Sequence, residues 1–222
     1  MDRLLKNPEA LVFDLDGTLI HSAPDLQLAA NTALERIGRE PLDLPTIVSF
    51  IGNGIETLVV RILDATGGAD DPLRQEVLAS FHTIYAQNVT TFTRPYPDVV
   101  QALQKFREMG VPLGICTNKP TEPAREICHR LKLSQYFDAI VGAEPDQPKK
   151  PNPQSLIDCI NRIGGTLDGT VYVGDSVVDF QTARNGGVAF RLFAGGYLNA
   201  PLPDLAESDR FEDWSANGIA GC

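Results

Sequence analysis

From about residue 97 onward the sequence alternates short apolar runs with amphipathic segments, and this alternation restricts the fold more than any other feature. The short apolar runs fit strands that are buried on both faces, and the segments between them carry apolar residues at helical spacing. A chain of this kind forms a parallel sheet covered by helices on both faces. The expected strands lie at 112–116, 139–141, 170–173 and 188–192, and the expected helices at 99–109, 123–131, 153–163 and 177–185.

An apolar strand at 10–13 belongs with this sheet, but a long helical block follows it. Apolar residues recur at helical spacing over 24–37, 45–50, 55–63 and 71–87. We interpret the block as an insertion between the first strand and its first crossover helix. The sequence thus predicts a Rossmann-like α/β fold in which residues 1–20 and 93–222 form the core domain and residues 21–92 form an inserted helical bundle.

Carboxylates stand where the expected strands end. Asp14 and Asp16 follow the first strand, Thr117 follows the next, and Asp175 and Asp179 follow the strand at 170–173. Ligands of open parallel sheets bind at the carboxyl ends of the strands, so these side chains should meet in one crevice. Four carboxylates in one place repel each other unless a cation lies among them, and Mg²⁺ prefers oxygen ligands. We therefore expect a Mg²⁺ site.

A single aspartate at the start of a helix more often caps the helix than binds a metal. This is the structural alternative for Asp175, and it is the interpretation we adopt for Asp98, next to Pro97. The paired spacing at Asp14 and Asp16, together with a second pair at Asp175 and Asp179, favours the metal site.

The turn after the first strand suits phosphoryl transfer. One carboxylate of the first pair can attack phosphorus while the other moves protons, and Gly17 lets the backbone approach a ligand closely. Thr117 and a lysine can hold the phosphoryl oxygens. The lysine lies in the Lys149–Lys150 pair, between prolines that keep the loop extended.

Together these residues resemble the four ordered motifs of the haloacid dehalogenase superfamily phosphatases. The resemblance implies that Asp14 forms an aspartyl-phosphate, that Asp16 is the general acid and base, and that Thr117 hydrogen-bonds the phosphoryl group. It also implies a lysine that bridges the nucleophile and the phosphate, and we choose Lys150 over Lys149 because it directly precedes Pro151. It implies that Mg²⁺ is held by the Asp14 side chain, the Asp16 carbonyl and Asp175, with Asp179 acting through water. We also assign Gly17 and Asn118 to phosphate binding.

The helical insertion corresponds to the cap domain of that superfamily. The segments FIGNGIETLVVRIL, RPYPDV and TNKP are more similar to bacterial phosphoglycolate phosphatases than to other members. Gly52, Asn53 and Gly54 precede a helix and could offer backbone amides to the carboxylate of 2-phosphoglycolate. The alternative is a plain loop between two cap helices.

Other activities stay open at this point. Phosphatases of sugar phosphates, amino-sugar phosphates, nucleotides or pyrophosphate share the motifs. A β-phosphoglucomutase shares both aspartates but would need a cation near the cap loop, where this sequence has Ile51, Asn53 and Ile55. Arg61 could substitute for that cation, but we favour a place on the surface of a helix for it. Asp16 argues against a dehalogenase, and the lack of any lysine over 24–87 argues against a phosphonatase. A non-catalytic protein that binds a phosphorylated metabolite is the alternative from another class.

Charge and composition restrict the partners. The formal net charge is −10 and no basic run is present, so we expect a small phosphorylated metabolite and neither nucleic acid nor a membrane surface. The four cysteines form no Cys-x-x-Cys pair, and no signal segment or membrane span is visible. A cytoplasmic protein with reduced thiols is expected. The sequence does not indicate an oligomeric state.

Overall fold

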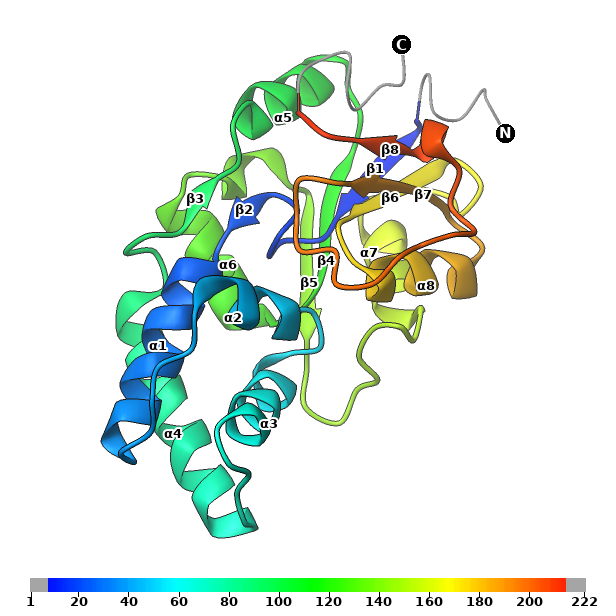
Figure 1. Cartoon of the computed structure of the whole chain (residues 1–222). Helices are drawn as coiled ribbons and strands as arrows, with labels where there is room; N and C mark the ends of the chain where they lie inside the picture. Colours follow the sequence, from blue (N-terminus) through cyan, green and yellow to red (C-terminus); the bar gives the residue numbers. More distant parts are fainter. Residues whose placement is uncertain (1–7, 215–222) are drawn as a thin grey trace.

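The computed structural model describes residues 8–214, and in this range the strands of the core form one parallel sheet (Figure 1). Its order is β5-β4-β1-β6-β7-β8. The strands β1 and β6, which end just before Asp14 and Asp175, are therefore neighbours, and β4, which contains Thr117, lies on the other side of β1. The strands are β1 (Ala10–Phe13), β4 (Leu113–Pro120), β5 (Ala139–Ala143), β6 (Thr170–Gly174), β7 (Ala189–Phe193) and β8 (Arg210–Phe211).

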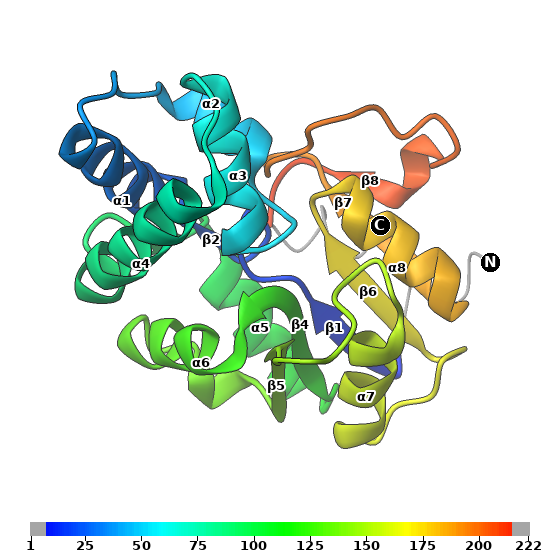
Figure 2. The ribbon, with the colours of Figure 1, turned by 90° about the horizontal axis from the view of Figure 1, so that it is seen from below.

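Alternate residues of β1 build two apolar layers, one on each face of the sheet. Leu11 and Phe13 lie in the same cluster as residues of α5 (Val99–Glu108) and α6 (Thr121–Arg130). Ala10 and Val12 lie in a second cluster with residues of α7 (Gln154–Arg162) and α8 (Val177–Gly186). Figure 2 shows these two helix pairs on opposite faces of the sheet.

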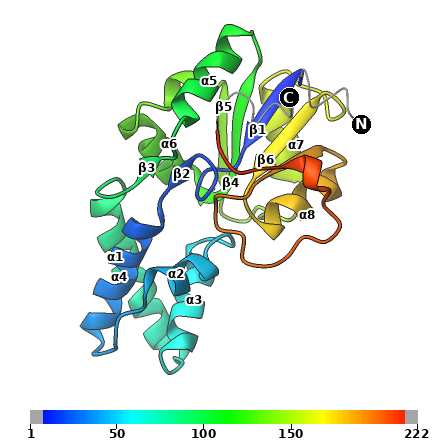
Figure 3. The same ribbon diagram turned by 45° about the horizontal axis from the view of Figure 1, so that its top comes forward.

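Four helices follow β1, and they gather beyond the carboxyl ends of the strands, apart from the sheet (Figure 3). A short antiparallel pair of β2 (Ile20–His21) and β3 (Arg94–Pro95) joins them to the core. The helices pack on one another: α1 on α2 and α4, and α3 on α2 and α4. They are α1 (Ala23–Arg36), α2 (Leu44–Phe50), α3 (Ile55–Ala65) and α4 (Asp71–Asn88).

The buried carboxylate of Asp25 ties the two ends of this helical segment together. It lies in the first turn of α1 and accepts hydrogen bonds from the backbone N–H groups of Phe92 and Thr93, at 2.9 and 2.8 Å. The Thr93 hydroxyl donates to it as well, at 2.7 Å. Because Asp25 and Thr93 are fully buried, the crossing between core and helical segment has a defined geometry.

The α/β fold with helices on both faces is confirmed, while the division into domains at residues 20 and 93 stays a prediction. The short edge strand β8 was not predicted, and β4 continues four residues beyond its expected end at Cys116. The prediction that Asp98 caps a helix is wrong. Asp98 precedes α5 with a positive φ of 63°, and its side chain makes no capping hydrogen bond.

Three cysteines, Cys116, Cys128 and Cys159, are free and buried, and Cys222 lies outside the described residues. Across residues 8–214, no helix has both the length and the apolar character needed to cross a membrane.

Candidate active site

The turn after β1 places Asp14 and Asp16 differently. The backbone N–H of Asp14 bonds to the carbonyl of Val173 in β6, so Asp14 still belongs to the sheet edge, whereas Asp16 lies in the turn beyond it. Gly17 has a φ of +89°, which favours glycine, and a Cβ there would collide with the Asp175 carboxylate. The turn therefore packs directly on the loop after β6.

Lys150 joins the two groups of carboxylates. Its buried Nζ lies 2.9 Å from Asp14 and 2.6 Å from Asp179, and it also donates to the hydroxyl of Tyr172 at 2.8 Å. Burial alone lowers the pKa of Lys150, but the two carboxylates raise it above the usual value, so the amine stays charged. Lys149 instead forms an exposed ion pair with Glu56 of α3 at 2.9 Å.

Asp175 is not the cap of α8. Its two oxygens accept hydrogen bonds from the Thr18 hydroxyl and from the backbone N–H of Tyr197, both at 2.7 Å. Ser176 caps the helix in a reciprocal capping box with Asp179. The Asp175 carboxylate is thus free of the helix and directed to the turn after β1.

The Asp179 carboxylate is saturated by the protein. One oxygen accepts from Lys150 and Tyr172, and the other from the backbone N–H and hydroxyl of Ser176. A carboxylate has about four acceptor positions, so Asp179 has little capacity left for a metal ion. Its arrangement suits the positioning of Lys150 better than direct coordination.

Burial makes this cluster a poor place for negative charge without a cation. Burial raises the pKa of Asp14 from 3.8 to about 6, Lys150 partly offsets this, and Asp179 adds to it. Burial, followed by the charges of Asp179 and Asp14, also raises the pKa of Asp175 well above its usual value. One oxygen from each of Asp14, Asp175 and Asp179 lies within 4.8 Å of the other two, so three carboxylates are crowded into one small region.

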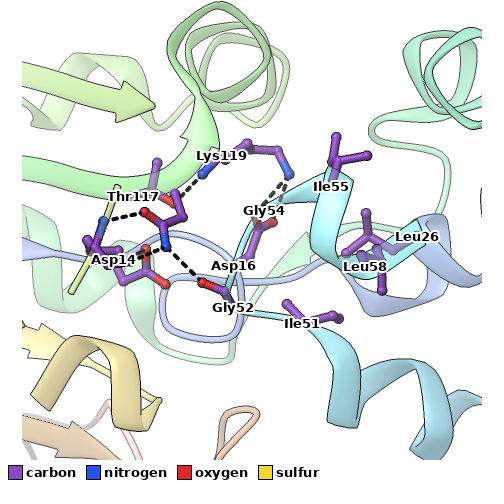
Figure 4. A pocket seen from close by; sticks show the side chains of 12 residues that line it. Asp14, Asp16, Leu26, Ile51, Gly52, Gly54, Ile55, Leu58, Thr117 and Lys119 are labelled. Carbon is purple, nitrogen blue, oxygen red and sulfur yellow. Dashed lines mark hydrogen bonds and ion pairs between the residues drawn. The ribbon is translucent and has the colours of Figure 1, made fainter. Parts of the chain in front are cut away.

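Thr117 and Asn118 follow on β4. Thr117 is buried and lines the cavity beside Asp14. Asn118 accepts from the backbone N–H of Lys150 at 2.8 Å and donates to the carbonyl of Gly52 at 3.0 Å (Figure 4). Asn118 therefore holds the Lys150 loop and touches the helical segment at the same time.

The loop between α2 and α3 divides into residues that face the site and one that does not. Gly52 and Gly54 line the cavity beside Asp14. Asn53 turns its side-chain oxygen toward Arg61, which donates to it at 3.0 Å and to the carbonyl of Phe50 at 2.8 Å. Arg61 thus stabilises the loop from within the helical segment.

Several functional candidates escaped the sequence-based reasoning. Lys119 lies on β4 and bonds both oxygens of Asp16, at 2.8 and 3.1 Å, and the hydroxyl of Tyr85 in α4. Tyr172 supports Lys150, and Thr18 supports Asp175. Sequence spacing does not reveal these contacts, because Lys119, Tyr172 and Thr18 each meet a residue far away in the chain.

Comparisons with known proteins agree with this geometry. A family model of haloacid dehalogenase-like hydrolases matches residues 11–193. A phosphoglycolate phosphatase of Cereibacter sphaeroides is 41% identical over 202 residues, which cover 90% of this chain and 92% of that protein. One from Rhodobacter capsulatus is 40% identical over 209 residues, covering 93% and 94%.

A crystal structure of a predicted phosphoglycolate phosphatase from Haemophilus somnus superposes with a TM-score of 0.87 at 27% identity, covering 93% of this chain and 95% of that one. These comparisons confirm the resemblance seen in the motifs. They favour an enzyme over a non-catalytic protein that binds a phosphorylated metabolite. The chain belongs to the haloacid dehalogenase-like hydrolases and is a phosphatase among them.

Proposed function

We propose that the protein hydrolyses 2-phosphoglycolate to glycolate and phosphate, with Mg²⁺, through an aspartyl-phosphate on Asp14. The observation that carries the proposal is the separation of two carboxylates that stand two residues apart. Asp14 pairs with Lys150 in the buried cluster, whereas Asp16 pairs with Lys119, which also bonds Tyr85 of the helical segment. Two environments for neighbouring carboxylates suit two roles in one reaction.

The residues fit a magnesium ion. Asp14 and Asp175 are buried carboxylates with raised pKa values, and hard oxygen ligands of this kind relieve their repulsion by binding a divalent cation. We assign the ion to the Asp14 and Asp175 side chains and the Asp16 carbonyl, with Asp179 holding Lys150. A bound Mg²⁺ would neutralise charge on the phosphoryl oxygens.

The reaction then follows from the chain's own groups. A carboxylate oxygen of Asp14 attacks phosphorus, the bond to the ester oxygen breaks, and Asp16 donates a proton to that leaving oxygen. Asp16 next takes a proton from water, whose oxygen attacks the aspartyl-phosphate and releases phosphate from Asp14. Lys150 and Thr117 hold the phosphoryl oxygens during both steps.

The helical segment contributes one side of the cavity that contains the two aspartates. We propose that this segment acts as a cap, because Gly52, Gly54, Ile55 and Leu58 line the cavity together with Asp14 and Asp16. The choice of 2-phosphoglycolate as substrate is supported by the curated relatives, which are phosphoglycolate phosphatases. A cytoplasmic location remains a prediction.

The experiment is a comparison of kcat/KM for a panel of phosphate esters with Mg²⁺, including 2-phosphoglycolate, a hexose phosphate, a nucleotide and pyrophosphate. The wild-type protein should prefer 2-phosphoglycolate, and Asp14→Asn should lose activity on every ester. A preference for another ester would refute the assignment of 2-phosphoglycolate as the substrate but would not affect the assignment as a phosphatase. Full activity of Asp14→Asn would overturn the mechanism.

A further inference from the structure

Lys119 is a buried cation that the phosphoryl-transfer steps do not use. Its side chain is 3% exposed, and its Nζ lies 2.8 Å from the hydroxyl of Tyr85 in α4 and 2.8 Å from Asp16. The ammonium also lies 5.0 Å from the centre of the Tyr85 ring. A lysine of the core sheet is thus fixed between the proposed proton-transfer group and a cap helix.

The other nearby cations are committed elsewhere. The Lys150 ammonium meets Asp14, Asp179 and Tyr172. Lys149 is paired with Glu56 outside the cavity, and Arg61 holds the cap loop. Among the residues that line the cavity, the only cations are Lys119 and Lys150. A second negative charge on a substrate therefore has one cation to meet, Lys119.

The surroundings of Lys119 suit an anion. The cap wall beside it is apolar and is formed by Leu26, Ile51, Ile55 and Leu58 (Figure 4). An anion against such a wall is costly unless it meets a positive charge. The Lys119 ammonium supplies such a charge at this wall.

We infer that the Lys119 ammonium binds the carboxylate of the substrate and selects phosphate esters of short carboxylic acids, with Tyr85 keeping the ammonium in place. The inference rests on the proposed function. An ammonium has three donors, and those of Lys119 serve Asp16 and Tyr85. An arriving carboxylate shares them, in a site shielded from water where a charge-assisted bond is strong.

The test is the ratio of kcat/KM for 2-phosphoglycolate to that for 2-hydroxyethyl phosphate, which has an alcohol in place of the carboxylate. Removing a charged partner from a buried site costs about tenfold to several hundredfold. We expect Lys119→Met to lower the ratio at least 30-fold and Tyr85→Phe about fivefold. Lys149→Met, the matched control on an exposed lysine, should leave the ratio unchanged.

Binding gives a second readout that needs no turnover. In the Asp14→Asn background, Lys119→Met should weaken calorimetric binding of 2-phosphoglycolate at least 30-fold and that of inorganic phosphate far less. If Lys119→Met does not fold, Lys119→Gln takes its place in the same measurements.

The two proposals fail in different ways. If kcat/KM for both esters falls by the same factor in Lys119→Met, the lysine acts only through Asp16 and the inference is wrong. A wild-type ratio near one also overturns it. If the wild-type protein hydrolyses neither ester, the proposed function itself is wrong.

Discussion

Neutralising Asp14 should stabilise the metal-free protein at alkaline pH while removing its activity. Burial raises the pKa of Asp14 from 3.8 to about 6, so at pH 8 the folded protein holds a carboxylate that its surroundings disfavour. Each pKa unit corresponds to about 1.4 kcal/mol, so ionised Asp14 costs the fold about 3 kcal/mol. Asparagine has nearly the same shape and no charge. Asp14→Asn should therefore gain up to about 3 kcal/mol, or roughly 6–12 °C in Tm for a domain of this size.

The gain must depend on pH in a defined direction. An acid with a raised pKa in the fold contributes stability that is fully present below its unfolded value of 3.8 and is lost as the pH rises through about 6. The advantage of Asp14→Asn should be small near pH 4, reach about half its final size at pH 5 and be complete by pH 8.

Urea unfolding of both proteins at pH 5, 6, 7 and 8, with a chelator present, measures this difference. Excess Mg²⁺ should then stabilise the wild-type protein, by about 2.7 kcal/mol at 100 times its Kd, and the variant less. Asp16→Asn is the matched control of opposite sign, because it leaves the buried Lys119 without its ion-pair partner. An advantage of Asp14→Asn that is absent, or equal at every pH, would refute the account of the cluster.

Two further substitutions probe the backbone of the site and the joint with the helical segment. Gly17→Ala should lower kcat/KM at least 100-fold and weaken Mg²⁺ binding, because the new Cβ collides with Asp175. The control is Gly38→Ala, which should keep full activity because Gly38 has a similar φ of +69° but open space around it. Asp25→Ala should lower the free energy of unfolding by about 3 kcal/mol in urea titrations, because it leaves two buried donors of Thr93 and the partly buried N–H of Phe92 unpaired. Thr93→Val, which loses one hydroxyl, should cost about 1 kcal/mol. Full activity of Gly17→Ala would contradict the first prediction. Equal losses of unfolding free energy for Asp25→Ala and Thr93→Val would contradict the second.

The prediction of the sheet edge from sequence rested on one geometric rule. The carboxyl ends of parallel strands lie at one edge of the sheet. The sequence therefore predicts that the residues after the strands at 10–13 and 170–173 lie close together. The structure adds that their strands are direct neighbours and that Asp175 bonds Thr18, across 157 positions of sequence. Lys150 was chosen on its place before proline, and the structure indeed brings it, and not Lys149, to Asp14.

The helical segment was harder to interpret. Helical spacing located its helices within a few residues, because an amphipathic period depends only on nearby positions. The period does not say which face of α4 meets the core, so the contact of Tyr85 with Lys119 could not be foreseen. The orientation of Asn53 toward Arg61 could not be foreseen either, because it depends on how α2 and α3 pack.

The sequence by itself thus determined the α/β class, the inserted helices, and the residues at the strand ends, because these follow from local periodicity and from the direction of parallel strands. Only the tertiary structure decided how the charges are distributed among partners. In the structure Lys150 forms ion pairs with Asp14 and Asp179, and Lys119 forms one with Asp16. The physical reason is that burial and the pairing of charges depend on distances between segments far apart in the chain, which no local pattern encodes.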